Sequence, residues 1–402
     1  MNGLGFALLS VGVIGSVSST VYLVIALLGV KKFRDGEKQQ IAEAETQSAR
    51  GLPPVSLLKP LHGMEVQLER NLKSFFLQGY AGEFEVIFAV DHPDDAALPV
   101  AERVCGRFPQ VHSQILVTGE PIWPNPPAYA FSRMTEAARH DILVTSDSDV
   151  EVDRDYLSSI VPPLCTPSNG MLTCVYRGGN TGGILSALDA IGMSVEMTAG
   201  VLAANLLEGM KFGLGPTIAI RRDALTSIGG YESLGDYFSN DFVIGNLVAA
   251  KGLHVVLSRH IISHVVPPMT FGQMWRRQVR WATGTKHSRP KGHFGTVFVF
   301  AIPYGLAGFF GGLLAGNFVF GAGLLALALL NRLVENYVIG WGVTRDRQCL
   351  TKPWLYPLRD LLGFAVWVAS YMSRNMRWRD GRFELVKGGR IRVRDRVAMG
   401  QE

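Results

Sequence analysis

Long apolar stretches lie at both ends of the chain, and the middle alternates short apolar runs with helical patterns. Residues 3–30 carry no charged side chain and end at the basic cluster Lys31-Lys32-Phe33-Arg34. This stretch is long enough to cross a bilayer, and its length and lack of a basic start argue against a cleaved signal peptide. The basic cluster predicts that the N-terminus lies outside and that the following residues lie in the cytoplasm.

The middle of the chain has the alternating pattern of an α/β sheet. Strands are predicted at residues 55–58, 84–90, 113–117 and 142–145, and helices at 66–78, 98–108 and 131–138. The run at 142–145 is β-branched and too short for a helix, so it is predicted to be a buried parallel strand.

Residues 184–207 are almost apolar enough to span a membrane, but Asp189 and Glu196 interrupt them. We therefore predict an amphipathic helix. It either packs in the core or faces a lipid acceptor, to which flexible side chains such as Met193, Met197 and Met210 would adapt.

The C-terminal part contains further apolar stretches. Residues 295–330 carry no charge and are about twice as long as one span requires, so two crossings are predicted, with a turn near Gly311-Gly312 or Asn317. Residues 333–343 and 361–372 are either crossings or interfacial segments. The basic stretch 374–396 is predicted to be cytoplasmic, which favours an even number of crossings after the middle segment.

These patterns predict five parts. They are a transmembrane helix at residues 1–30, a connector at 31–51, a globular domain at 52–293 that includes an interfacial helix at 271–286, transmembrane or interfacial helices at 294–373, and a basic cytoplasmic tail at 374–402.

Composition supports a membrane protein with a cytoplasmic domain. Hydrophobic residues make up 48% of the 402 residues and charged residues only 18%, which is lean for a soluble protein. The net charge of +5 comes without a lysine block, so nucleic acid is a poorer partner than an anionic membrane leaflet or small molecule. Four well-separated cysteines fit a reducing compartment and argue against a zinc site.

Polar side chains follow three of the predicted strands. Lys59 ends the first, Asp91 follows the second, and Asp147 and Asp149 follow the strand at 142–145. In open α/β sheets the working groups gather at the carboxyl ends of the strands. The Asp-x-Asp pair offers oxygen ligands through which a divalent cation can bridge to a phosphate, although such pairs are also common in solvated turns.

Two further motifs lie outside these strands. Asp241 heads an apolar helical pattern beside Asn240, where helix capping is an equally good explanation. The predicted interfacial helix carries Arg277, Arg280 and Trp281, whose guanidinium groups could face phosphates. A basic helix that lies on the membrane without a catalytic part is the alternative.

Taken in order, these residues resemble the D, DxD, D, (Q/R)xxRW pattern of membrane-bound glycosyltransferases with a GT-A fold. Residues 56–63 and 146–150 are most similar to the ceramide glucosyltransferase family (glycosyltransferase family 21). Residues 193–200 and 208–212 resemble its bacterial branch, the hopanoid-biosynthesis-associated glycosyltransferases. The resemblance spans nearly the whole chain.

The resemblance implies an α/β, Rossmann-like GT-A domain in the cytoplasm, flanked by transmembrane helices of a multi-pass protein in the bacterial inner membrane. It implies an inverting hexosyltransferase that moves one sugar, glucose or N-acetylglucosamine, from a UDP-sugar to a lipid alcohol such as a hopanoid or ceramide. A processive polysaccharide synthase shares the motifs but usually has Gln at the position of Arg277. A catalytically inactive membrane scaffold or lipid-binding protein is the remaining alternative.

The resemblance also implies roles for the acidic residues. Asp147 and Asp149 would hold Mg²⁺ or Mn²⁺, which binds the donor diphosphate and neutralises charge as the sugar–phosphate bond breaks. Asp91 would contact the uridine side, with Lys59 as a further residue of the nucleotide pocket. Asp241 would take the proton of the acceptor hydroxyl.

The basic motif would complete the donor site. Arg277 and Arg280 would clamp the diphosphate by bidentate hydrogen bonds, and Trp281 would hold the helix at the cleft. Two positions depart from the family pattern. Asn240 stands where Glu often precedes the aspartate, and the segment from Asn125 to Tyr129 lacks the usual lysine, which puts a donor contact there in doubt.

Overall fold

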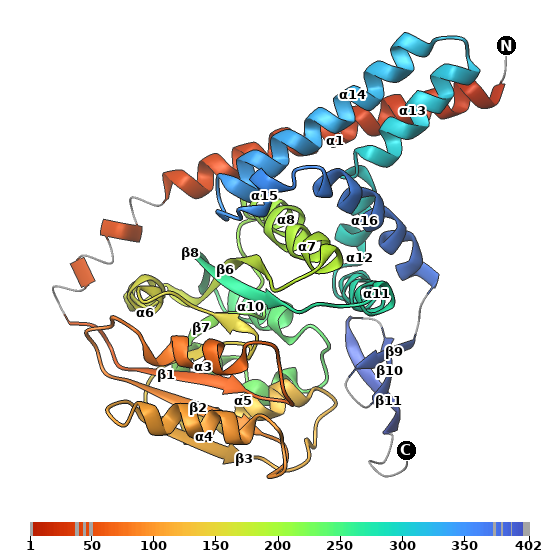
Figure 1. The fold of residues 1–402 in the computed structure, drawn as a ribbon. Helices are drawn as coiled ribbons and strands as arrows, with labels where there is room; N and C mark the ends of the chain where they lie inside the picture. The colour runs from red at the N-terminus through yellow and green to blue at the C-terminus, as the bar shows by residue number, and fades with distance from the viewer. Residues whose placement is uncertain are drawn as a thin grey trace. The chain divides into compact units, whose positions relative to one another are not determined.

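The computed structural model describes residues 3–36, 40–42, 46–47, 51–372, 375–378, 381–386 and 388–396 (Figure 1). The chain forms two compact units. Unit 1 consists of Met1–Phe33, Arg177–Leu207 and Val266–Arg374, and unit 2 of Arg34–Tyr176, Glu208–Val265 and Asn375–Glu402. Residues 177–207 and 266–293, which lie inside the predicted globular domain at 52–293, group with the apolar helices of unit 1. The predicted domain ranges stay a prediction.

Unit 2 is built on a mixed sheet of eight strands in the order β3-β2-β1-β4-β7-β6-β8-β5. The strands are β1 (Val55–Pro60), β2 (Phe84–Val90), β3 (His112–Val117), β4 (Ile142–Thr145), β5 (Val150–Glu151), β6 (Asn169–Asn180), β7 (Ile218–Arg221) and β8 (His254–Val266). Strands β1 to β4 are parallel, whereas β7 runs antiparallel to β4 and β6. The four predicted strands are confirmed within a residue or two, while β5, β6, β7 and β8 were not predicted.

Helices pack against the sheet of unit 2 and against one another. They are α3 (Leu68–Phe76), α4 (Leu98–Arg107), α5 (Pro126–Ala137), α6 (Tyr156–Ile160), α9 (Arg222–Ser227) and α10 (Asn240–Ala250), with 3-10 turns at Pro162–Cys165 and Tyr231–Leu234. Alternate strand residues such as Leu57 and Val144 pack with Phe75 of α3 and Val104 of α4 in one buried core. Helix α5 contacts β1 and β2 from the other face. It begins five residues before its predicted start, because Asn125 caps it ahead of two prolines.

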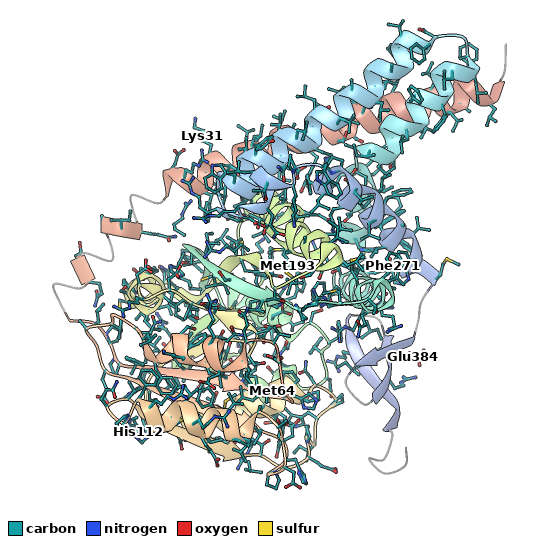
Figure 2. All side chains as sticks on the ribbon, in the orientation of Figure 1. Lys31, Met64, His112, Met193, Phe271 and Glu384 are labelled. Carbon is teal, nitrogen blue, oxygen red and sulfur yellow. The ribbon has the colours of Figure 1, made fainter. Side chains whose placement is uncertain are left out.

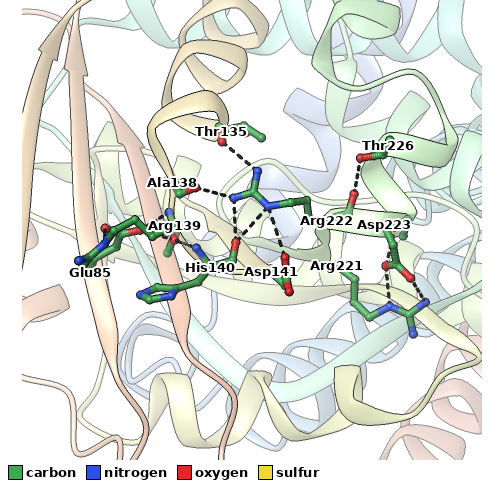
Figure 3. A network of polar contacts seen from close by, with 12 residues as sticks. Glu85, Thr135, Ala138, Arg139, His140, Asp141, Arg221, Arg222, Asp223 and Thr226 are labelled. Atoms are coloured by element: carbon green, nitrogen blue, oxygen red, sulfur yellow. Dashed lines mark hydrogen bonds and ion pairs between the residues drawn. The ribbon is translucent and has the colours of Figure 1, made fainter.

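A polar network fixes the beginning of β4 (Figure 3). Arg222 donates hydrogen bonds to the carbonyls of Thr135, Ala138 and His140 at the end of α5. Buried Glu85 accepts from Ser56 and from Arg139. Burial by itself would raise the pKa of Glu85, but these hydrogen bonds outweigh it and lower the pKa. The network anchors one end of β4 and so determines where Asp147 emerges at the other end.

The basic tail forms a second sheet. Strands β9 (Asn375–Trp378), β10 (Gly381–Val386) and β11 (Arg390–Arg396) pair antiparallel in the order β11-β10-β9. The sequence predicted only a basic cytoplasmic segment here, and the hairpins were not predicted.

Unit 1 is helical. Its elements are α1 (Gly3–Asp35), α7 (Ile184–Ile191), the π-helix η2 (Gly192–Met197), α8 (Thr198–Leu207), α11 (Phe271–Ser288), α12 (Pro290–Gly295), the 3-10 turn η4 (Thr296–Phe298), α13 (Ile302–Leu314), α14 (Phe318–Glu335), the π-helix η5 (Asn336–Trp341), α15 (Gln348–Thr351) and α16 (Leu355–Met372). In the described part of the chain, three helices are long and apolar enough to cross a membrane, or four if the pair Pro290–Phe298 and Ile302–Leu314, bent by 41°, is one span.

Several predicted features of unit 1 can be compared with these helices. The turn between α13 and α14 lies at Asn317, whose side chain caps α14, and not at Gly311-Gly312. The predicted separate stretch 333–343 is wrong, because α14 continues through η5. Residues 184–207 are helical and are one of the three helices long and apolar enough to cross a membrane, so the expectation that Asp189 and Glu196 exclude a span is wrong by this measure. Met193 (Figure 2) is only 4% exposed.

Buried charges satisfy the backbone at the bend before α13. Asp360 accepts hydrogen bonds from the N–H groups of Ala301 and Ile302 at 2.9 and 2.7 Å. Arg332 donates to the carbonyl of Val299 at 3.1 Å and forms an ion pair with Asp360 at 3.4 Å. Non-helical backbone at membrane depth is tolerated only where such partners exist, so these side chains stabilise the bend.

Candidate active site

The loop after β4 carries the Asp-x-Asp pair, and its backbone is held by three different elements. Buried Lys59 of β1 donates to the carbonyl of Asp147 at 2.6 Å, and Asn71 of α3 donates to that of Ser148 at 3.2 Å. The N–H of Val265 in β8 donates to the carbonyl of Asp149 at 2.7 Å. Because the carbonyls of this loop have partners in the protein, its two carboxylates are held at defined positions at the sheet edge.

Asp241 lies opposite this loop, across Gly215. Its carboxylate accepts hydrogen bonds from the N–H groups of Gly215, at 3.0 Å, and Phe242, at 2.8 Å. A Cβ added to Gly215 would lie 3.3 Å from an Asp241 oxygen and 3.6 Å from an Asp147 oxygen. Because Gly215 has no side chain, the carboxylates of Asp147 and Asp241 can both lie next to it. Ser239, not Asn240, is the N-cap residue of α10, although the side chain of Asn240 accepts a hydrogen bond from the N–H of Asp241 at 2.9 Å.

Burial and the repulsion between neighbouring carboxylates shift the pKa values of these side chains. Burial raises the pKa of Asp147, and the nearby charge of Asp149 raises it further. Burial also raises the pKa of Asp241, against hydrogen bonds from backbone N–H groups that lower it. Burial lowers the pKa of Lys59, opposed by the charges of Asp147 and Asp149. Crowded carboxylates of this kind favour a bound cation or a shared proton.

Two residues that the sequence did not indicate complete the group. Nδ1 of His264 on β8 lies 3.3 Å from a carboxylate oxygen of Asp149. Glu65, in the loop after β1, has a pKa raised by burial and by Asp149, while a hydrogen bond from Ser148 lowers it. Glu65 follows the predicted strand at 55–58, so the sequence could have placed it at this edge of the sheet. His264 lies on a strand that was not predicted.

Asp91 stands at the same edge, after β2. Its carboxylate lies 3.9 Å from Nδ1 of His62 in the loop after β1. Neighbouring Asp95 accepts hydrogen bonds from the N–H of Gly63 at 2.9 and 3.1 Å. The loops after β1 and β2 are thus tied together beside the carboxylate group. Lys59 is fully buried and acts on this site through the backbone of Asp147, and its predicted contact with a nucleotide stays a prediction.

The predicted phosphate-binding arginines belong to unit 1. Arg277 forms an ion pair with Asp189, a fully buried residue of α7, and its guanidinium lies 4.9 Å from the centre of the Trp281 ring. Gln278 also donates to Asp189. The Nε of Arg280 is buried and has no hydrogen-bond partner among the described residues. The charge of Arg277 is therefore balanced within unit 1, whereas Arg280 keeps an unused donor.

The donor set after β4 fits a divalent cation. Two carboxylates with a nearby imidazole offer the oxygen and nitrogen ligands that Mg²⁺ and Mn²⁺ accept, and Mg²⁺ commonly takes one or two carboxylates plus substrate phosphates. After burial, the negative charge of Asp149 is the next cause that raises the pKa of Asp147, and a cation would neutralise this charge. Asp153, Asp155 and His260 form a second possible cation group, but both of its aspartates are exposed.

Comparison with solved structures defines the class of fold. A mannosyltransferase from Pyrobaculum calidifontis, solved in complex with GDP-Man and Mn²⁺, matches with a TM-score of 0.50 and 17% identity, covering 90% of this chain and 99% of that one. The fold is that of a GT-A glycosyltransferase, as predicted.

Sequence comparison defines the family. The sequence profile of glycosyl transferase family 21 matches residues 11–391. The chain therefore belongs to this family. Ceramide glucosyltransferase 1 of Caenorhabditis elegans is 24% identical over 348 residues, which cover 85% of this chain and 74% of the relative. A ceramide glucosyltransferase of Komagataella phaffii is 32% identical over 130 residues, 31% of this chain and 25% of the relative.

These findings confirm that the protein is a glycosyltransferase and that its resemblance to the ceramide glucosyltransferase family is correct. Its apolar helices agree with a membrane enzyme. The assignment to the hopanoid branch is not confirmed.

Proposed function

We propose that this glycosyltransferase moves a single hexose, glucose or N-acetylglucosamine, from a UDP-sugar to the hydroxyl group of a membrane lipid. The observation that carries the proposal is the grouping of Asp147 and Asp241 around Gly215, with Asp149 near enough to Asp147 to raise its pKa. Such a group combines carboxylates for a cation with a separate carboxylate that can accept a proton. These are the two elements that a displacement at the anomeric carbon of a nucleotide sugar requires.

Asp241 acts as the base in this proposal. Its two backbone hydrogen bonds fix the carboxylate, and burial raises its pKa, which makes it a stronger base at neutral pH. Removal of the proton from the acceptor hydroxyl lets the oxygen attack the anomeric carbon from the face opposite the leaving diphosphate. A single displacement therefore converts an α-linked donor into a β-linked product.

The remaining residues hold the donor. Asp147 and Asp149, with His264 beside them, would hold Mg²⁺ or Mn²⁺, which supplies positive charge to the leaving diphosphate. Asp91 contacts the uridine side. Arg280 is the better of the two arginines for the diphosphate, because Arg277 already forms an ion pair with Asp189, and Arg277 and Trp281 support the same helix.

The acceptor reaches the site from the bilayer. The relatives named above are ceramide glucosyltransferases, which supports a lipid alcohol such as ceramide. A hopanoid acceptor rests on the sequence resemblance of residues 193–200 and 208–212. The basic residues after α1 and in the tail support a cytoplasmic site on a multi-pass protein, and the bacterial inner membrane is the compartment we propose.

Product length distinguishes this proposal from its main rivals. Membranes containing the protein, incubated with labelled UDP-glucose or UDP-N-acetylglucosamine and either ceramide or a hopanoid polyol, are expected to yield a lipid heavier by one sugar. Mass spectrometry of the extracted lipid measures this. A polymer would identify a processive synthase, and the absence of both product and UDP binding would support an inactive scaffold.

A further inference from the structure

The segment that leads into Asp241 is held in place from one side by α5. Fully buried Asn125 donates its side-chain amide to the carbonyl of Tyr237 at 2.6 Å, and its backbone N–H donates to the carbonyl of Gly235 at 2.9 Å. Trp123 packs so closely that a Cβ on Gly235 would lie 2.9 Å from its ring. Residues 235–238 therefore have a defined position on this side.

The C-terminal sheet holds the same segment from the other side. The N–H of Ile391 donates to the carbonyl of Asp236 at 2.7 Å, and the N–H of Phe238 donates to the carbonyl of Gly389 at 2.9 Å. Tyr237 and Arg390 form an antiparallel β-bridge, and the Arg390 guanidinium lies 5.1 Å from the centre of the Tyr237 ring. Residues 389–391 thus add a short strand to residues 236–238.

We infer that the start of β11 is a positioning element for the catalytic carboxylate. Phe238 lies three residues before Asp241, and α10 begins at Asn240, so the backbone at 236–238 determines where the first turn of α10 starts. The inference rests on the role proposed for Asp241. Among the contacts that the structure describes, residues 389–391 meet residues 236–238 and not Asp241. They act through the segment that carries Asp241.

The local sequence suits this docking. Gly388 and Gly389 have φ values of +85° and +78°, a left-handed conformation that glycine adopts without strain. Their turn brings β11 back against β10 while directing its first residues to the segment before α10. Ile391 is 7% exposed, so the docked strand also buries an apolar side chain.

Charge alone would not explain this contact. Arg390 and Arg392 are both exposed and lie on the same strand, but only Arg390 contacts the Tyr237 ring among the contacts that the structure describes. The two arginines therefore form a matched pair. A general attraction of the basic tail for anionic donors or lipids depends on both, whereas the docking depends on Arg390.

The test uses the full-length enzyme in lipid nanodiscs and three variants. Ile391→Pro removes the N–H that donates to Asp236, Arg390→Ala removes the cation over Tyr237, and Arg392→Ala is the control. Hydrogen exchange of peptides covering residues 235–241, Mn²⁺-dependent UDP affinity and kcat are measured. We expect Ile391→Pro to speed exchange in these peptides and to lower kcat about tenfold, with UDP affinity changed less than about twofold.

For Arg390→Ala we expect the same pattern with a drop in kcat of about threefold, in line with an exposed cation–π contact, and no change for Arg392→Ala. Equal effects of the two arginine variants, or unchanged exchange and kcat in both Arg390→Ala and Ile391→Pro, would overturn the inference. Hydrogen exchange is measured without substrate turnover, so it reports on the docking of the strand independently of the catalytic role of Asp241. Faster exchange in Ile391→Pro, together with an Asp241→Asn enzyme that stays active, would refute the proposed base and therefore the positioning role, but not the docking itself.

Discussion

Asp241→Asn is expected to lower the rate of sugar transfer by about 10³-fold or more, close to the loss that removal of a general base produces. Asparagine keeps the size of the side chain, and its single amide oxygen can still accept one of the two hydrogen bonds that Gly215 and Phe242 donate to separate carboxylate oxygens. It cannot take the proton of the acceptor hydroxyl. UDP affinity in the presence of Mn²⁺ is expected to change less than about threefold, because Asp241 is not among the residues that hold the donor.

Asp223→Asn is the matched control for this change. Asp223 also lies in the first turn of a helix, α9, but its carboxylate is exposed and pairs with Arg221. Its substitution is expected to leave transfer unchanged. Initial rates with radiolabelled donor and UDP titrations of the same preparations provide both readouts. If Asp241→Asn turned over at the wild-type rate, Asp241 could not be the base.

Asp149→Ala is expected to weaken Mn²⁺ binding by at least about 100-fold and to remove the metal-dependent part of UDP binding, because a directly ligating carboxylate is lost. Its carboxylate lies beside His264 and raises the pKa of Asp147, so it belongs to the centre of the acidic group. Chelation of divalent ions should abolish transfer in the wild-type enzyme, and added Mn²⁺ should restore it. Electron paramagnetic resonance of Mn²⁺ measures the affinity.

Two controls separate this site from other acidic positions. Asp141, at the far end of β4, has a carboxylate that is 93% exposed, and Asp141→Ala should bind Mn²⁺ as the wild type does. Asp155→Ala tests the second possible cation group with His260 and should not affect transfer. A transferase that keeps full Mn²⁺ affinity without Asp149 would show that the cation lies elsewhere.

The parallel half of the sheet was predictable because each strand is a short apolar run that ends in a polar residue. This pattern brought Lys59, Asp91 and Asp147 to one edge, as the structure shows. Strands β6 and β8 mix polar and apolar residues over 12 and 13 positions and carry no clear alternation, so the antiparallel half was missed. The same omission concealed His264, since nothing else in the sequence placed it near Asp149.

For the basic motif at Arg277 and Arg280, the sequence did not predict which residues the arginines contact. The spacing of Arg277 and Arg280 suggested two phosphate ligands, but it could not reveal that Asp189, about ninety residues earlier, is buried against Arg277. A carboxylate inside an apolar helix needs a cation, and that requirement could have linked the two in advance. The charge of the tail predicts only a basic cytoplasmic segment, whereas the glycine pair 388–389 is a turn signal between two strands.

The configuration of the product is the most direct test of the central claim, which is a single displacement driven by one base in this acidic group. Wild-type enzyme is given α-linked UDP-glucose and ceramide, and the anomeric proton of the glycolipid is examined by NMR spectroscopy. A β-linked sugar is the predicted result. An α-linked sugar would require a second displacement or a different reaction course and would contradict the role given to Asp241.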